Sequence, residues 1–230
     1  MSTPLKIRIA SYNVHKCVGL DGRRRPGRII DVLNSLAADI VVLQEADRRL
    51  GERPAAIPAR LIEEETDFRS LEISNSGPSI GWHGNAILVR KSLNSSPVEQ
   101  INLPGTEPRG ALGVQVAGLR VIATHLGLLR SDRRAQLRAI RDHLNGATTP
   151  AVILGDFNEW TRSRGLEPLA DGFDIHSPGR SFHAARPVAA LDRIATSIGL
   201  EMRDAGVVQS RTARIASDHL PIWADIQIAS

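Results

Sequence analysis

The sequence of 230 residues has few aromatic side chains, a single cysteine and no long hydrophobic run. Cys17 has no partner for an internal disulfide, which excludes a disulfide-stabilised scaffold and is typical of a reducing compartment. No apolar stretch reaches the roughly 18 residues that a membrane-spanning helix needs. The first 13 residues alternate apolar and charged side chains, which predicts a strand instead of a secretory signal. We therefore expect a cytoplasmic protein without a stable membrane anchor.

Lysine is also scarce, because 26 of the 29 basic residues are arginine. The formal net charge is +4. A guanidinium group binds phosphate or carboxylate through two hydrogen bonds, so this bias favours an anionic substrate. Clusters such as the arginines at 23–28 are nevertheless more often a solvated surface. Composition alone therefore does not identify the substrate.

Composition and periodicity predict one globular domain over residues 1–230. Hydrophobic residues make up 42% of the chain, enough for a substantial core, and no linker-like stretch divides it. Apolar runs predict strands at 1–13, 39–45, 68–73, 85–90, 111–116, 119–125, 150–155, 191–196, 200–207 and 220–228. Helical spacing predicts helices at 29–36 with Pro26 near the start, at 55–65, and from an N-cap at Ser131 to about Asn145. The fold class is α/β or α+β, with two packed sheets and helices outside.

Polar side chains repeatedly stand where an apolar strand ends. They are Asn13, Glu45, His125, Asp156 and Asn158, with Asp218 and His219 before the last strand and Asp192 between apolar neighbours. If these strand ends meet at one edge, the site contains several carboxylates, two imidazoles and two carboxamides. That set of groups suits metal-assisted phosphoryl chemistry.

Each of these groups has a physical reason to serve in such a site. Mg²⁺ prefers carboxylate oxygen, so Glu45, with Asp218 or Asn13 nearby, is the candidate metal-binding group. A histidine takes up a proton near neutral pH when a carboxylate orients its ring, and Asp192 with His219 is the candidate pair.

Donors are also needed where negative charge grows on the phosphoryl oxygens. His125, Asn13 and Asn158 fit that role. Taken singly, each motif is more often a loop, a cap or a turn, so the argument depends on their conjunction.

The conjunction resembles the endonuclease/exonuclease/phosphatase superfamily of Mg²⁺-dependent phosphoesterases. The motifs occur in the family's order and cover Ile7 to Ile226. They are Ser-Tyr-Asn13, Leu-Gln-Glu45, Gly84-Asn85-Ala, Thr-His125-Leu, Gly-Asp156-Phe-Asn158, Leu-Asp192-Arg-Ile and Ser-Asp218-His219-Leu-Pro. The resemblance implies a four-layered αββα sandwich with the site at one edge of the paired sheets.

The resemblance also implies roles for individual residues. Glu45 is the expected metal ligand, helped by Asn13 and Asp218. His219 is the expected general base, oriented by Asp192, and Asp156 is the rival base.

Three further roles follow from the same resemblance. Asn158 is expected to position the nucleophile and the phosphate. His125 is expected to stabilise the transition state or to assist the leaving group. Arg109, in a weaker match, is expected to contact phosphate.

Departures from the family pattern bear on the substrate. His15 stands where the exonuclease III branch has an aspartate, and that branch has a tyrosine in place of a Thr-His-Leu histidine. Both differences count against abasic-site repair. Thr-His125-Leu is closer to the sphingomyelinase, deadenylase, inositol-phosphatase and tyrosyl-DNA phosphodiesterase branches. His15 and Asn85 are further candidates for substrate contact, and Trp160 is a candidate for stacking on a base.

The sequence therefore predicts a Mg²⁺-dependent phosphodiester hydrolase, with Mn²⁺ as the alternative ion, acting by in-line attack of water on phosphorus. Nucleic acid is the favoured substrate because of the positive charge and the guanidinium content. The alternative is a phosphomonoesterase or a sphingomyelinase-like or phospholipase-like enzyme acting on a small phosphate or a lipid headgroup. A non-catalytic phosphate-binding module is the competing class. No obligate protein partner is expected.

Overall fold

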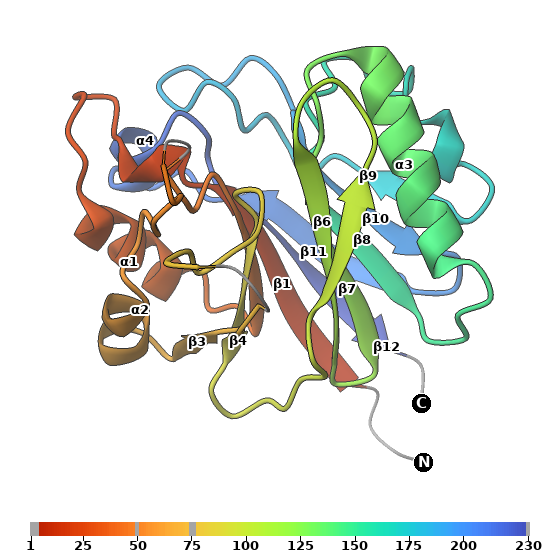
Figure 1. Cartoon of the computed structure of the whole chain (residues 1–230), viewed down its shortest axis with the longest axis horizontal. Helices are drawn as coiled ribbons and strands as arrows, with labels where there is room; N and C mark the ends of the chain where they lie inside the picture. The colour runs from red at the N-terminus through yellow and green to blue at the C-terminus, as the bar shows by residue number, and fades with distance from the viewer. Residues whose placement is uncertain (1–4, 49–50, 74–76, 229–230) are drawn as a thin grey trace.

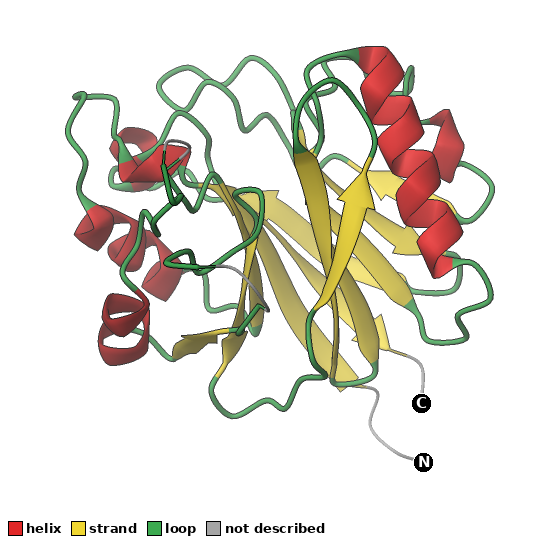
Figure 2. Cartoon of the chain, viewed as in Figure 1, coloured by secondary structure: helices red, strands yellow, loops and turns green. Residues whose placement is uncertain are grey.

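Two mixed β-sheets of six strands each pack face to face, with helices on their outer sides (Figures 1 and 2). The computed structural model describes residues 5–48, 51–73 and 77–228. The predicted αββα sandwich is confirmed.

The first sheet has the strand order β11-β12-β1-β2-β4-β3. These strands are β11 (Glu201–Val207), β12 (Ile222–Ile228), β1 (Leu5–Asn13), β2 (Ile40–Gln44), β4 (Ala86–Arg90) and β3 (Phe68–Ser70). β1 runs parallel to β2 and antiparallel to β12. The outer side of this sheet is covered by α1 (Pro26–Ser35), α2 (Ala59–Glu65) and the short α4 (Ala213–Ala216), which lie together in Figure 1.

The second sheet has the order β5-β6-β7-β8-β10-β9. These strands are β5 (Glu99–Leu103), β6 (Arg109–Val116), β7 (Leu119–His125), β8 (Ala151–Asp156), β10 (Asp192–Ser197) and β9 (Phe173–His176). β7 runs parallel to β8, and the long helix α3 (Arg130–Leu144) covers the outer side. Two 3₁₀ turns, η1 (His15–Cys17) and η2 (Glu167–Leu169), complete the described elements.

Alternation along the strands builds three apolar layers. In β1, Ile9 faces the second sheet, whereas the next residue, Ala10, and Tyr12 face the helices of the first sheet. In β8, Leu154 lies between the sheets and Ile153 packs under α3. The central strands are therefore buried on both faces, which is why they are nearly continuous apolar runs.

Several predicted boundaries were wrong. The helix predicted at 55–65 begins at Ala59, because Pro58 lies at its N-cap and Ala56 donates its backbone N–H to Ala46 instead. Ser131 is not an N-cap, since α3 begins at Arg130 and the Ser131 hydroxyl contacts Asp132. The strand predicted at 68–73 ends at Ser70.

Other differences concern elements and chain ends. β5 and β9 were not predicted because they are short edge strands with charged or polar side chains, which weaken the strand pattern. Residues 1–4 of the first predicted strand lie outside the described residues.

Candidate active site

The polar strand ends meet at one edge of the paired sheets. Asp156 at the end of β8 is the register partner both of His125 at the end of β7 and of Asp192 at the start of β10. β10 runs antiparallel to β8, so its beginning lies where β8 ends. In the first sheet, Asn13 pairs with Gln44, which places Glu45 beside the end of β1. The topology thus brings side chains from both sheets to a common edge.

The carboxylate of Asp156 lies at the centre of this edge. Its Oδ2 accepts a hydrogen bond of 3.1 Å from Asn13 Nδ2, and its Oδ1 accepts one of 2.9 Å from the backbone N–H of Asn158. The Nε2 atoms of His125 and His219 lie 3.5 Å and 3.6 Å from Oδ2. Because Asp156 is buried, these contacts replace the water that an exposed carboxylate would have.

The ring of His219 is held from its other side by Asp192. His219 Nδ1 lies 2.8 Å from Asp192 Oδ2, and the Ser181 hydroxyl donates to the same oxygen. The Phe182 ring packs against the imidazole with centroids 4.9 Å apart. These contacts fix the ring so that Nε2 points toward Asp156.

The pKa values of the two histidines are shifted in opposite directions. Burial disfavours charge on the His125 ring and lowers its pKa to about 4. Burial acts the same way on His219, but the negative charges of Asp192 and Asp156 outweigh it and raise the pKa of His219 to about 10. A neutral imidazole and a cationic imidazole therefore flank the same carboxylate near neutral pH.

Glu45 lies in an adjoining cavity of about 200 Å³, which His125 and Arg109 also line. Glu45 directly follows β2 with a positive φ of 52°. Its Oε2 forms an ion pair with the ammonium group of Lys16. Arg109 is buried at the start of β6 and donates a hydrogen bond of 2.8 Å to Glu107.

The remaining predicted residues lie around this centre. Asp218 Oδ1 is 3.8 Å from His15 Nδ1, which also lies 3.1 Å from the carbonyl oxygen of Val18. Asn158 Nδ2 donates a 2.8 Å hydrogen bond to the carbonyl of Leu126.

Two other predicted residues have different surroundings. Asn85 is buried and donates a 2.9 Å hydrogen bond to the carbonyl of Gly110, so this contact links the residue before β4 to β6. Trp160 is 63% exposed, and its ring meets Phe182 edge-on with centroids 5.9 Å apart. Trp160 therefore belongs to the rim of the site.

Sequence reasoning missed Lys16 and Ser181. Lys16 stands three residues after Asn13, so its proximity to the motif was a usable signal. Ser181 is a small polar residue in a loop, 11 residues from Asp192, and nothing in the local pattern marks it.

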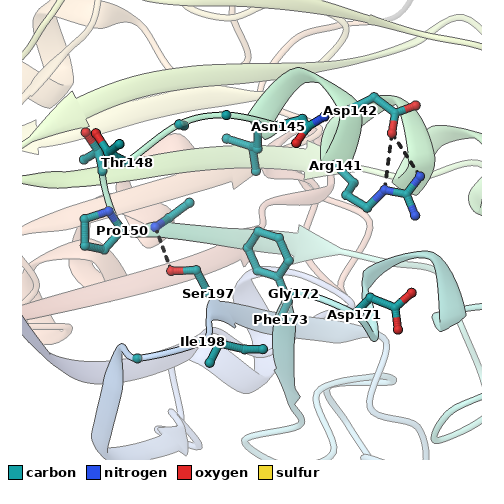
Figure 3. Close-up of a pocket in the computed structure, with 16 residues that line it drawn as sticks. Arg141, Asp142, Asn145, Thr148, Pro150, Asp171, Gly172, Phe173, Ser197 and Ile198 are labelled. Carbon is teal, nitrogen blue, oxygen red and sulfur yellow. Dashed lines mark hydrogen bonds and ion pairs between the residues drawn. The ribbon is translucent and has the colours of Figure 1, made fainter.

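A larger cavity of about 750 Å³ lies at the opposite end of β8 (Figure 3). Asn145, Thr148, Phe173 and Ile198 are among the residues that line it. Its charged side chains include Arg141 and Asp142, which bind each other at 3.0 Å. The size of a cavity therefore does not mark the site in this molecule.

The family model of the endonuclease/exonuclease/phosphatase family matches residues 10–219. The chain belongs to this family. Members of the endonuclease/exonuclease/phosphatase family are phosphoester hydrolases, in agreement with the chemistry of the polar edge.

The chain is also similar to three individual proteins. The uncharacterised protein YbhP of Escherichia coli K12 is 28% identical, and the match covers 96% of each chain. A family member from Beutenbergia cavernae has a crystal structure with a TM-score of 0.75 and 25% identity, covering 98% of this chain and 72% of that one. TDP2 of D. rerio, crystallised with a single-stranded DNA product, has a TM-score of 0.74 and 21% identity over 97% of this chain and 99% of that one.

The residues at this edge fit a divalent ion, which the endonuclease/exonuclease/phosphatase family generally uses. Ligand atoms of Asp156, Asp192 and His219 lie within 4.8 Å of one another. Asp192 Oδ1 is buried and has no hydrogen-bond partner among the described residues. Carboxylate and amide oxygens, including those of Glu45 and Asn13, are the donors that Mg²⁺ and Mn²⁺ prefer.

None of the helices in the described part of the chain is long and apolar enough to cross a membrane.

Proposed function

We propose that this protein is a Mg²⁺-dependent or Mn²⁺-dependent phosphodiester hydrolase in which water attacks phosphorus in line. One observation carries the proposal: Asn13, His125, Asp156, Asp192 and His219 are buried together at one sheet edge. Burying so many ionisable groups disfavours folding unless they are paired, and a fold retains such a cluster where chemistry needs it. The proposal treats residues 1–230 as one catalytic domain.

Glu45 would hold the divalent ion, with Asn13 and Asp218 as further ligands. Bound there, the ion would neutralise charge on the phosphoryl oxygens. His125 supports the same end, because its pKa of about 4 leaves the ring neutral and its N–H available as a donor to a phosphoryl oxygen.

His219 and Asp156 are the two candidates for the group that takes a proton from water. His219 is oriented by Asp192 at 2.8 Å and has the geometry of a base. Its raised pKa favours the protonated form, however, in which it would stabilise negative charge while Asp156 accepts the proton. The pH dependence described in the Discussion separates these assignments.

Nucleic acid is the substrate that the rim of the site favours. The segments 160–164 and 178–188 contain Arg162, Arg164, Arg180 and Arg186 and no acidic residue. Each segment adjoins a strand end or ring of the site, and Trp160 among them is 63% exposed. Guanidinium groups bind backbone phosphates and an exposed indole stacks on bases. The likeness of fold to TDP2, crystallised with single-stranded DNA, is in keeping with this substrate.

The buried free thiol of Cys17 supports a further proposal, a cytoplasmic location.

A substrate panel tests the proposed function. The purified protein is incubated with Mg²⁺ or Mn²⁺ and bis-p-nitrophenyl phosphate, p-nitrophenyl phosphate, single-stranded and duplex oligonucleotides, and phospholipid vesicles. We expect cleavage of the diester and of the single-stranded oligonucleotide, each abolished by EDTA. Faster hydrolysis of the monoester or of phospholipid would instead identify the alternative substrate classes. No EDTA-sensitive cleavage of any substrate would overturn the proposal.

A further inference from the structure

Lys16 lies in a strained turn beside the candidate metal site. His15, Lys16 and Cys17 have φ angles of 45°, 55° and 61°, a left-handed run that is unfavourable for residues with a Cβ. Hydrogen bonds hold this backbone. Lys16 N–H donates to the carbonyl of Glu45 at 3.1 Å, and the Arg24 side chain donates to the carbonyl of Lys16 at 3.1 Å. The turn is thus anchored directly to the residue that follows β2, and such strain is typical of functional sites.

The anchored turn directs the Lys16 side chain to the Glu45 carboxylate. The ammonium group pairs with Glu45 Oε2, and the side chains are 24% and 16% exposed. Both residues line the cavity that also contains His125 and Arg109. This pair is partly withdrawn from water, so its attraction is screened less than that of a surface ion pair.

The same carboxylate cannot serve an ammonium group and a divalent ion without a cost. An ammonium group that stays near Glu45 repels a second cation, and one that leaves gives up its ion pair. In both cases the presence of the Lys16 ammonium group makes the free energy of metal binding less favourable. A cation tethered in this position therefore weakens metal binding in proportion to the strength of its own contact.

We propose that Lys16 is a tethered counter-ion that competes with the divalent ion for Glu45 and thereby sets the metal affinity of the site. The inference rests on the proposed function, in which Glu45 holds the ion. In the absence of metal, the ammonium group neutralises Glu45. When Glu45 is occupied, the ammonium group is released within a cavity that also contains Arg109, where it adds a positive charge for an anionic substrate. By linkage, metal and anion then strengthen each other's binding.

The chain offers a matched control. Lys6 lies near the other end of β1 and pairs with Asp225 at 2.9 Å, with its side chain 62% exposed. It carries the same charge as Lys16 but does not line the Glu45 cavity. A general effect of removing one positive charge would appear in Lys6→Met as well as in Lys16→Met.

Mn²⁺ affinity, measured by calorimetry without substrate, tests the inference. We expect Lys16→Met to bind Mn²⁺ about tenfold more tightly than the wild type, as loss of a partly buried ion pair implies. Lys16→Arg, which keeps the charge, and Lys6→Met should stay within about threefold of the wild type. Without metal, Lys16→Met should also melt at a lower temperature than the wild type, because Glu45 loses its counter-ion, and Mn²⁺ should raise its melting temperature more.

The outcomes separate the inference from the proposed function. Unchanged or weaker Mn²⁺ binding by Lys16→Met, with normal binding by the wild type, would overturn the inference alone. If neither the wild type nor any variant bound Mn²⁺, the proposed function would fall, and the inference with it. Lys16→Gln replaces Lys16→Met in the same measurement if the methionine variant does not fold.

Discussion

β8 has a cavity near each end, and the smaller of the two is the one that adjoins the buried ionisable groups. At the Ala151 end, a cavity of about 750 Å³ is bordered by loop residues such as Ile198, which is 70% exposed. Near the Asp156 end, the cavity is about 200 Å³, but it adjoins buried carboxylates and imidazoles.

The difference shows how this fold localises its chemistry. The ends of β7 and β8, with the start of β10, bring ionisable groups from three strands to one edge. At the other end, the Ala151 N–H donates to the Ser197 hydroxyl at 3.0 Å, and the charges of Arg141 and Asp142 satisfy each other (Figure 3). Burial of mutually coupled charges is the better guide to function here, because it persists only where the structure compensates it.

The largest expected contrast is between substitutions at the two ends of β8. Asp156→Asn keeps the shape of the side chain but removes the negative charge between the two histidines. We expect kcat for bis-p-nitrophenyl phosphate with Mn²⁺ to fall by about 10³-fold. Ile198→Ser at the other end should leave kcat within about twofold. Retention of most of the activity by Asp156→Asn, or an equally large loss of activity in Ile198→Ser, would contradict this contrast.

A second prediction concerns the coupling of Asp192 to His219. The Asp192 charge helps to raise the pKa of His219 to about 10, so Asp192→Asn should lower that pKa. NMR titration of the ring protons measures the change directly. We expect kcat to fall by about 10²-fold as the ring loses its orientation. An unchanged pKa in the variant would contradict the coupling.

The pH profile of the wild type distinguishes the two candidate bases. If neutral His219 is the base, the rate must rise with pH until the pKa of His219 is passed. If Asp156 is the base and cationic His219 stabilises charge, the rate must fall as His219 loses its proton at high pH. The sign of the alkaline limb therefore assigns the roles.

A smaller effect is expected at the rim. Trp160→Ala removes an exposed ring that can stack on a base, so KM for a single-stranded oligonucleotide should rise about tenfold. The rate on bis-p-nitrophenyl phosphate, which has no base, should stay within about twofold. If Trp160→Ala changed the kinetics with both substrates equally, Trp160 would support the structure of the site and would not contact nucleic acid.

The smallest effect on kcat is expected for substitution of Glu159, which is buried next to the site. The effect of this substitution is expected on the stability of the fold. Burial disfavours its charge, but the N–H of Thr161 and the guanidinium groups of Arg133 and Arg130 outweigh burial and lower its pKa to about 2. Because the pKa of Glu159 is lower in the folded protein than in the unfolded chain, its charged carboxylate stabilises the fold above about pH 4.5. This contribution is lost as the pH falls toward 2.

Glu159→Gln should therefore lower the free energy of unfolding by about 2–3 kcal/mol at pH 7, as measured with urea. The difference from the wild type should shrink at pH 3. A difference that is independent of pH would show that shape, and not charge, makes Glu159 stabilising.

The sequence predicted the polar edge because strand direction determines it. Asn13, His125 and Asp156 end apolar runs, and the ends of parallel strands meet at the same edge of a sheet. The roles assigned to these residues stay predictions until variants are measured.

Contacts between distant loops were beyond the sequence. The pair of Lys16 with Glu45 depends on a turn with positive φ angles. The bond from Ser181 to Asp192 depends on how a loop folds back against β10. The hydrophobic periodicity of the sequence does not predict such geometry. The start of α2 was missed for a related reason, since the backbone bond of Ala56 to Ala46 is a long-range contact that overrides helical spacing.

Metal dependence tests the central claim most directly. Protein stripped with EDTA is titrated with Mn²⁺ while hydrolysis of bis-p-nitrophenyl phosphate is followed, for the wild type and for Glu45→Gln. We predict no turnover without metal, a saturable return of activity in the wild type, and at least about a tenfold higher Mn²⁺ requirement in Glu45→Gln. Hydrolysis that persists in EDTA, or an unchanged Mn²⁺ requirement in Glu45→Gln, would contradict a metal-dependent site built around Glu45.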